Sequence, residues 1–233
     1  MSKQHTSSRK TRKIAAIAAG ALVVGLGATY TLATWNDSEW VWGGADGGPG
    51  IGTERFDVEQ FTEGAWHDDE TNPGGALDFT TAALALTPGD TVYAPMSLRT
   101  KTNSIGGSVE LQGAVAAAGV AVEDAGNELW DAVALSVYTS ADATAPSCSA
   151  AAVTAGDWTA VPGIGSSPLG TGATPGTGAQ TLAAATTTDP GAPQHYCFVI
   201  ALPDDAQQVA ESAGVDLQGR TIAPAWEFAA ESD

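Results

Sequence analysis

Residues 91–101 read TVYAPMSLRTK and decide the fold, because their apolar and polar side chains alternate. One face of this run is apolar throughout, which predicts a β-strand with a single buried side. That face consists of Val92, Ala94, Met96 and Leu98. Pro95 cannot donate a hydrogen bond to a neighbouring strand, so we expect an edge strand or a β-bulge at this point.

Four further segments carry strand patterns on either side of this run, at 108–115, 129–138, 196–202 and 221–230. Turn residues separate them, notably Pro88-Gly89-Asp90 and Asn103 with Gly106-Gly107. Short strands with recurring turns and no long stretch of helical period predict an all-β, antiparallel β-sandwich. We expect one short helix at 204–213, where two aspartates suit a helix N-terminus.

Two segments have low complexity, 43–52 and 161–193. The second holds seven glycines and five prolines in 33 residues. A segment of this composition buries too little apolar surface to order itself well. We therefore expect 161–193 to be a long Gly/Pro-rich surface loop of a single domain that spans 53–233.

The first 33 residues have the organisation of a secretory signal peptide. Five of the nine basic residues lie in the first 13, and an uncharged stretch from Ile14 to Asn36 follows. Small side chains at Thr31 and Ala33 predict cleavage between Ala33 and Thr34, and the remainder is expected to be secreted. An uncleaved membrane anchor is the alternative, because about 20 apolar residues can span a bilayer.

The chain after the predicted cleavage site is strongly acidic. It contains 27 acidic residues against four basic ones and therefore has a formal net charge of −23. Nucleic acids and anionic bilayers both reward clusters of lysine and arginine. We therefore expect neither as a partner, and membrane contact only through the signal segment before cleavage.

Three stretches resemble one known family. Residues 25–39 read GLGATYTLATWNDSE, residues 86–90 read LTPGD with Asn103 downstream, and residues 217–230 contain LQGRT and WEFAA. The first is similar to the junction cut by SipW-type signal peptidases in Gram-positive bacteria, and all three are similar to elements of the TasA/camelysin-like substrates of these enzymes. The resemblance implies a jelly-roll-like sandwich, a signal peptidase as partner during export, and a place in the biofilm matrix or on the cell surface.

Three tryptophans follow the predicted cleavage site within eight residues: Trp35, Trp40 and Trp42. Exposing them to water is unfavourable, at about 25 cal/mol per Å² of apolar surface. Either they fold back onto their own sandwich, or the segment 34–52 adds a strand to a neighbouring subunit. The family resemblance implies the second arrangement, with the glycine run at 43–52 as hinge and a homo-oligomer or a related matrix protein as partner.

Cys148 and Cys197 form an even pair in a chain that we expect to be exported, so a disulfide is the default interpretation. It would close a loop of about 50 residues at the base of the Gly/Pro-rich segment. Two buried thiols or a redox pair are the alternative, although the spacing lacks the Cys-x-x-Cys arrangement.

No strong catalytic motif is present, and we expect no cofactor. The sequence has no His-Glu-x-x-His for zinc and no Gly-x-Ser-x-Gly for a nucleophilic serine. The compact group His67-Asp68-Asp69-Glu70 is a candidate for calcium or another hard cation, but it lacks the spacing of an EF-hand, and a solvated acidic turn is the simpler reading. His195 is interpreted as a loop residue that enters a strand.

Three functions remain open at this point. The first is a secreted, non-enzymatic surface or matrix protein that assembles into fibres. The second is a secreted metallopeptidase, since camelysin-type proteins are classed as such, and it would need His67 or His195. The third is a monomeric cell-surface binding module.

Overall fold

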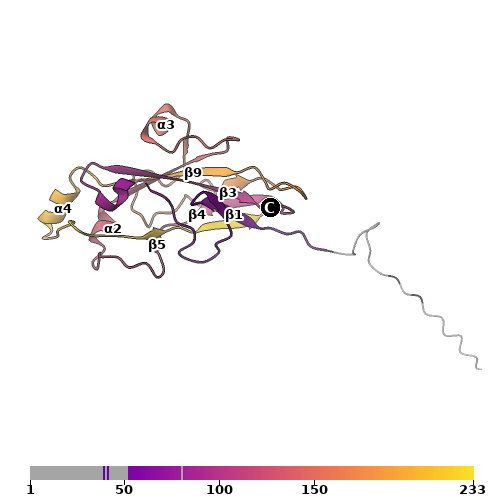
Figure 1. The fold of residues 1–233 in the computed structure, drawn as a ribbon, viewed down its shortest axis with the longest axis horizontal. Helices are drawn as coiled ribbons and strands as arrows, with labels where there is room; N and C mark the ends of the chain where they lie inside the picture. The colour runs from indigo at the N-terminus through magenta and orange to yellow at the C-terminus, as the bar shows by residue number, and fades with distance from the viewer. Residues whose placement is uncertain (1–38, 40, 42–51, 80) are drawn as a thin grey trace, which may run out of the picture. The chain divides into compact units, whose positions relative to one another are not determined.

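The chain divides into two units, Met1–Gly52 and Thr53–Asp233. The computed structural model describes residues 39, 41, 52–79 and 81–233, so the following account concerns the second unit. This unit is an all-β sandwich, as predicted from the alternating pattern of 91–101 (Figure 1). None of the described helices is long and apolar enough to cross a membrane.

One layer of the sandwich is a six-stranded antiparallel sheet with the order β2-β1-β3-β9-β6-β7. The facing strands form a three-stranded sheet, β11-β4-β8, and a two-stranded sheet, β10-β5. The strands are β1 (Val58–Thr62), β2 (Ala65–His67), β3 (Thr91–Thr100), β4 (Gly107–Leu111), β5 (Val115–Ala116), β6 (Ala134–Ser140), β7 (Thr159–Ala160), β8 (Gln180–Leu182), β9 (Gln194–Ala201), β10 (Pro224–Ala225) and β11 (Phe228–Ser232). The helical elements are η1 (Thr81–Ala85), α2 (Glu128–Ala132), α3 (Ala150–Ala155) and α4 (Ala206–Ser212).

The core lies between the two layers. The apolar face predicted for β3 is buried, with Val92, Ala94, Met96 and Leu98 at most 4% exposed. Aromatic rings connect the layers: Phe198 on β9 packs against Trp226 at a centroid distance of 4.9 Å, and Tyr196 packs against Phe228 at 4.8 Å. Burial of Tyr196 keeps its phenol neutral by raising its pKa above the ordinary value.

Pro95 lies in β3. This strand has a neighbouring strand on each side, but β1 does not run along its whole length. β1 pairs only with the second half of β3, from Ser97 to Thr100, whereas β9 pairs with Thr91–Leu98. At Pro95 the strand therefore has one partner, and its missing N–H can point away from the ladder. β3 is thus central in the sheet but has the character of an edge at the proline.

The strand predicted at 129–138 begins too early. Residues 128–132 form the short helix α2, and β6 starts only at Ala134. The carboxylate of Asp124 accepts hydrogen bonds from the backbone N–H groups of Leu129 and Trp130, which holds the first turn of the helix. A helix was correctly predicted near 204–213, where α4 forms.

The Gly/Pro-rich segment 161–193 is largely irregular, but it is better packed than its composition predicted. It provides strand β8, which pairs with β4, and it buries Val161, Ile164, Leu169, Ala173 and Leu182 in the core. Its backbone also bonds to the sandwich, with Ala173 N–H donating to Leu111 and Ala114 N–H donating to Leu169. The apolar residues are too sparse to produce a periodic pattern, so their place in the core could not be predicted from the sequence.

A second, smaller apolar cluster covers the outer face of the six-stranded sheet. Figure 1 shows α3 above β9, on the side opposite β5. The disulfide between Cys148 and Cys197 joins this segment to β9, which confirms the predicted pairing. Trp158 packs in the same cluster, and its indole N–H donates to the carbonyl of Ser147 at 3.0 Å. A disulfide of this kind fits an oxidising, non-cytoplasmic environment.

Candidate functional site: the cleft between the sheets

A cleft of about 2020 Å³ adjoins the packed core of the sandwich. The inner faces of β1, β3 and β9 form one wall, residues 217–228 form the opposite wall, and the connection from β2 to β3 crosses between them. Apolar side chains form much of both walls, among them Leu86, Ile222 and Trp226, and the deepest ones, such as Met96 and Leu98, also belong to the buried core. An apolar cleft of this kind is the most prominent candidate binding site in the described part of the chain.

The rim of the cleft is also apolar. Leu84 is 93% exposed, Val115 is 55% exposed and Val120 is 49% exposed, and all three line the cleft. Contiguous exposed apolar surface marks interaction sites more often than it occurs without a function. Acidic side chains, among them Asp68, Asp69 and Glu70, also line the cleft, so its apolar surface is interrupted by negative charge.

An unpaired strand edge borders the cleft. Within the described residues, β10 pairs only with β5 and β11 pairs only with β4, so the other edge of both strands is free. Trp226 lies between these two strands, and its buried indole N–H has no acceptor among the described residues. Free backbone groups at such an edge can pair with a further strand.

The predicted assembly segment and cleavage site lie outside the described residues. These are Ala33 and Thr34 at the expected cut, and Trp35, Trp40 and Trp42 after it. The described chain begins close to the cleft, since Phe56 lines it only a few residues after Gly52. In the sequence, the predicted hinge at 43–52 ends four residues before Phe56.

The predicted cation group does not act as one unit. His67 lines the cleft on β2, Asp68 forms an ion pair with Lys101, and Asp69 accepts a hydrogen bond from Gln60 at 3.0 Å. Glu70 is exposed. Among the described residues, no group of three or more histidine, cysteine, aspartate or glutamate side chains is close enough to hold a metal ion.

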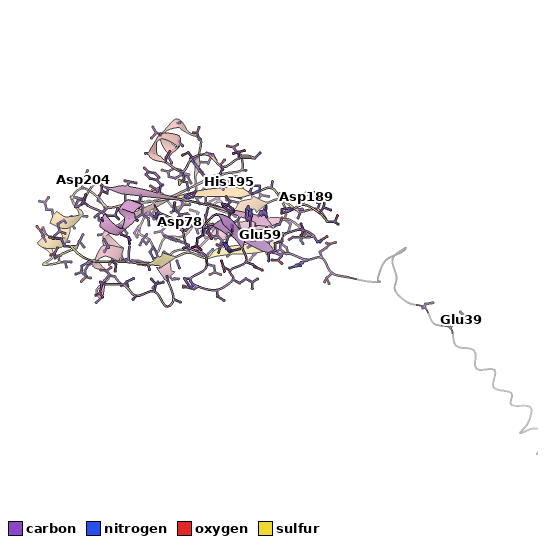
Figure 2. All side chains as sticks on the ribbon, in the orientation of Figure 1. Glu39, Glu59, Asp78, Asp189, His195 and Asp204 are labelled. Carbon is purple, nitrogen blue, oxygen red and sulfur yellow. A yellow bond between two sulfur atoms is a disulfide. The ribbon has the colours of Figure 1, made fainter. Side chains whose placement is uncertain are left out.

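His195 lies on the opposite face of the sheet from His67. The pairing of β3 with β9 places His195 beside Ser97 on the outer face of the sheet. The pairing of β1 with β2 places His67 beside Gln60 on the cleft side. The Nδ1 atom of His195 is 2.6 Å from the Ser97 hydroxyl, and its buried Nε2 atom has no partner among the described residues. The two histidines therefore cannot ligate the same ion. Figure 2 shows His195 on the side of the sheet that faces α3.

We expect the stability of the fold to fall as the pH drops below about 6.5. Burial lowers the pKa of His195, and the nearby Asp142 offsets this only in part. The unfolded chain thus takes up a proton at a pH at which the folded chain does not, so acidification favours unfolding until the pH passes below the folded-state pKa. Urea unfolding at pH 7.5 and at pH 5.5 measures this loss.

The variant His195→Gln is the control for this pH dependence. It removes the titrating group and retains a polar side chain that can bond to Ser97, so the difference between the two pH values should shrink. Asp57 and Asp90 do not interfere, because the pKa of each lies below its ordinary value and they titrate only in stronger acid. An unchanged difference in the variant would assign the effect to another group.

All four basic residues after the predicted cleavage site are paired with carboxylates. Arg99 is 2.6 Å from Glu59, Lys101 is 3.0 Å from Asp57, and Arg220 is 2.6 Å from Glu128. The fourth pair joins Arg55 to Asp57. The hydrogen bond to Asp68 raises the pKa of Lys101 further. No base is left to neutralise the remaining acids, so the surface of the described part is dominated by negative charge.

These features define a class of protein: an acidic, disulfide-linked β-sandwich with an open apolar cleft. No protein-family model, no curated protein and no solved structure matches the chain.

The cleft could not be predicted from the sequence. Its walls come from β1, β3, β9 and the segment 217–228, which are far apart along the chain. The wall residues of β3 alternate as in any strand with one buried face, and those of β9 belong to a continuous apolar run, so no local signal shows that a cleft adjoins them.

Proposed function

We propose that the protein is a secreted, acidic, non-enzymatic surface or matrix subunit of the TasA/camelysin type that self-associates through its N-terminal segment. Export is supported by the signal-like organisation of residues 1–33 and by the disulfide. Self-association is supported by one observation above all, the apolar cleft beside a free strand edge.

The segment that follows the predicted cleavage site has the chemistry to cover this cleft. It carries Trp35, Trp40 and Trp42, which are unfavourable in water, and the cleft offers apolar walls to receive them. The glycine run 43–52 can span up to about 35 Å when extended, which allows the segment to reach a neighbouring subunit. Pairing with the free edge of β10 and β11 would add backbone hydrogen bonds to the apolar contact.

The net charge of the exported chain supports a regulated association. At −23 the subunits repel one another, and each of the four bases is already paired within its own subunit. Salt screens this repulsion, and at about 0.1 M ionic strength charges more than about 10 Å apart interact only weakly. Assembly should therefore proceed faster as the ionic strength rises, and light scattering at increasing sodium chloride measures the effect.

The decisive experiment compares the mature chain with a Trp40→Ala/Trp42→Ala variant by light scattering and electron microscopy, after mass spectrometry of the N-terminus. The mature chain should start at Thr34 and form growing, elongated particles, and the variant should remain a monomer. Val209→Ala is the matched control, because it also removes an exposed apolar side chain, 61% exposed on α4, but lies outside the cleft. It should assemble like the unmodified chain.

Two results would contradict the proposal. A stable monomer under all salt conditions would mean that the tryptophans cover their own cleft, and the binding-module function would replace assembly. Chelator-sensitive cleavage of casein by the purified chain would replace it with the peptidase function.

A further inference from the structure

The loop between β8 and β9 contains the only Asp-Pro sequence of the chain, Asp189-Pro190. The aspartate is exposed and the proline is half-buried, so water has access to the peptide bond between them. Figure 2 shows Asp189 at the opposite end of the sandwich from Asp204. The nitrogen of this bond belongs to a tertiary amide and carries no hydrogen, so the bond differs chemically from the other aspartyl peptide bonds of the chain.

Thr186 contacts the carbonyl oxygen of this peptide bond. Its backbone N–H donates to the Asp189 carbonyl at 2.8 Å, and its hydroxyl oxygen lies 3.4 Å from the same atom. Donors on a carbonyl oxygen stabilise the negative charge that develops when a nucleophile attacks the carbonyl carbon. The Asp189–Pro190 bond is therefore polarised for attack.

The side chain of Asp189 is the nucleophile nearest to this carbonyl. Its Oδ2 atom accepts a hydrogen bond from the Thr188 hydroxyl at 2.8 Å and lies 3.4 Å from the Thr186 hydroxyl. The Thr186 hydroxyl thus contacts both the carboxylate and the carbonyl oxygen, which keeps the carboxylate folded toward its own carbonyl group. Well-oriented groups within one molecule react with effective concentrations of about 10⁵–10⁸ M.

Contacts on both sides of the bond hold the loop in this arrangement. The Thr186 carbonyl accepts from the backbone N–H of Asn103 at 2.8 Å, and the N–H of Gly191 donates to the Thr100 carbonyl at 3.0 Å. Gly191 lies so close to the neighbouring backbone that an added Cβ atom would be 2.2 Å from the Ala183 carbonyl oxygen. The exposed bond is therefore anchored to the end of β3 and the turn that follows it.

We propose that the Asp189–Pro190 peptide bond is a self-cleavage site that opens in mild acid. A carboxyl oxygen of Asp189 bonds to the carbonyl carbon of the same residue, and the carboxyl proton passes to the Pro190 nitrogen as the carbon–nitrogen bond breaks. This step leaves a cyclic anhydride at Asp189 and a secondary amine at Pro190. Water then opens the anhydride to a pair of carboxyl groups, so the net reaction is hydrolysis of the peptide bond. Acid is needed because the leaving nitrogen must gain a proton, and carboxyl groups in general begin to take up protons near about pH 4.

The disulfide keeps the cleaved chain together. The bond opens between Cys148 and Cys197, so each of the two fragments carries one of the linked cysteines. The second fragment contains β9, which retains its pairing with β3 and β6. Cleavage thus converts one chain into two disulfide-linked chains within the same sandwich, and it does not depend on self-association.

The test is incubation of the oxidised mature chain at about pH 4.5 and about pH 7.5, followed by mass spectrometry with and without reductant. At the acidic pH the chain should gain the mass of one water molecule, and reductant should then release a fragment that starts at Pro190. Asp189→Glu should slow the reaction at least tenfold, because its longer side chain closes a larger ring.

Thr186→Val should also slow the reaction at least threefold, because it removes the hydroxyl that contacts the carbonyl oxygen. Thr187→Val is the matched control, since this exposed neighbour makes no hydrogen bond to Asp189 in the described part of the chain. Its rate should equal that of the unmodified chain. Hydroxylamine added during the reaction should leave a hydroxamate at Asp189, which identifies the anhydride.

Unfolding in urea separates this arrangement from the general lability of Asp-Pro bonds in acid. The unfolded chain loses the contacts of Thr186 and should cleave at least fivefold more slowly at the same pH. Equal or faster cleavage in urea would overturn the site, as would an unchanged mass at acidic pH or equal rates in Thr186→Val and Thr187→Val. A carboxylic acid alone at Asp189 in the presence of hydroxylamine would exclude the anhydride.

Discussion

Replacing both Cys148 and Cys197 by alanine should lower the free energy of unfolding by roughly 4 kcal/mol, the value of the chain-entropy model for a loop of about 50 residues. The bond joins residues 49 apart in sequence, so its loss frees a large part of the unfolded chain. Urea unfolding of the variant and of the unmodified chain measures the difference. Reducing agent should shift only the unmodified chain, which controls for effects of the substitutions themselves.

The loss should first affect the cluster on the outer face of the sheet. Cys197 is fully buried there beside Trp158, and α3 follows directly after Cys148. Reduction at low denaturant should therefore expose Trp158 before the sandwich unfolds. Comparison with a Trp158→Phe variant assigns the fluorescence change to this residue among the seven tryptophans of the chain. Equal stability of the oxidised and reduced chains would contradict the assigned role of the bond.

Truncating Phe198 to alanine should cost about 3–5 kcal/mol, the range measured for large-to-small changes at buried aromatic sites. Phe198 is fully buried on β9 and contacts the rings of Trp226 and Phe228, at centroid distances of 4.9 and 6.2 Å. It therefore joins the six-stranded sheet to the facing layer across the packed core. A domain of this size is stabilised by about 5–15 kcal/mol in total, so the variant should be partly unfolded at moderate denaturant.

Phe61→Ala provides the matched control for this truncation. Phe61 is 36% exposed on the outer face of β1, and its ring contacts Trp66 at 5.3 Å. The same truncation there leaves no enclosed cavity, so the cost should be about 1 kcal/mol. Similar losses at the two positions would mean that the sheets are held together mainly by contacts other than the ring cluster.

The sequence predicted the features that depend on local pattern. The alternation in 91–101 is visible because successive side chains of a strand point to opposite faces, and this periodicity survives in any sheet arrangement. The disulfide was predictable because two cysteines allow only one pairing within a chain. A helix at 204–213 was predictable because Asp204 and Asp205 suit a helix N-terminus.

Features that depend on distant partners were not predictable. Residues 128–132 form a helix because Asp124 holds its N-terminus, and Arg220, 96 residues from Asp124, binds that carboxylate at 3.2 Å. The segment 161–193 is packed because its backbone pairs with β4 and β6 and its few apolar side chains join the core, and composition alone does not show either contact.

The sequence by itself thus determined the class of the fold, the covalent cross-link and the acidic charge, since each follows from residue identity and spacing. Only the tertiary structure decided where a cleft adjoins the sandwich and how the segment 161–193 is packed. A cleft is a property of how two sheets fit together, and the packing of an irregular segment is a property of which strands it meets. Neither has a local signal, because both arise from contacts between residues that are far apart in the chain.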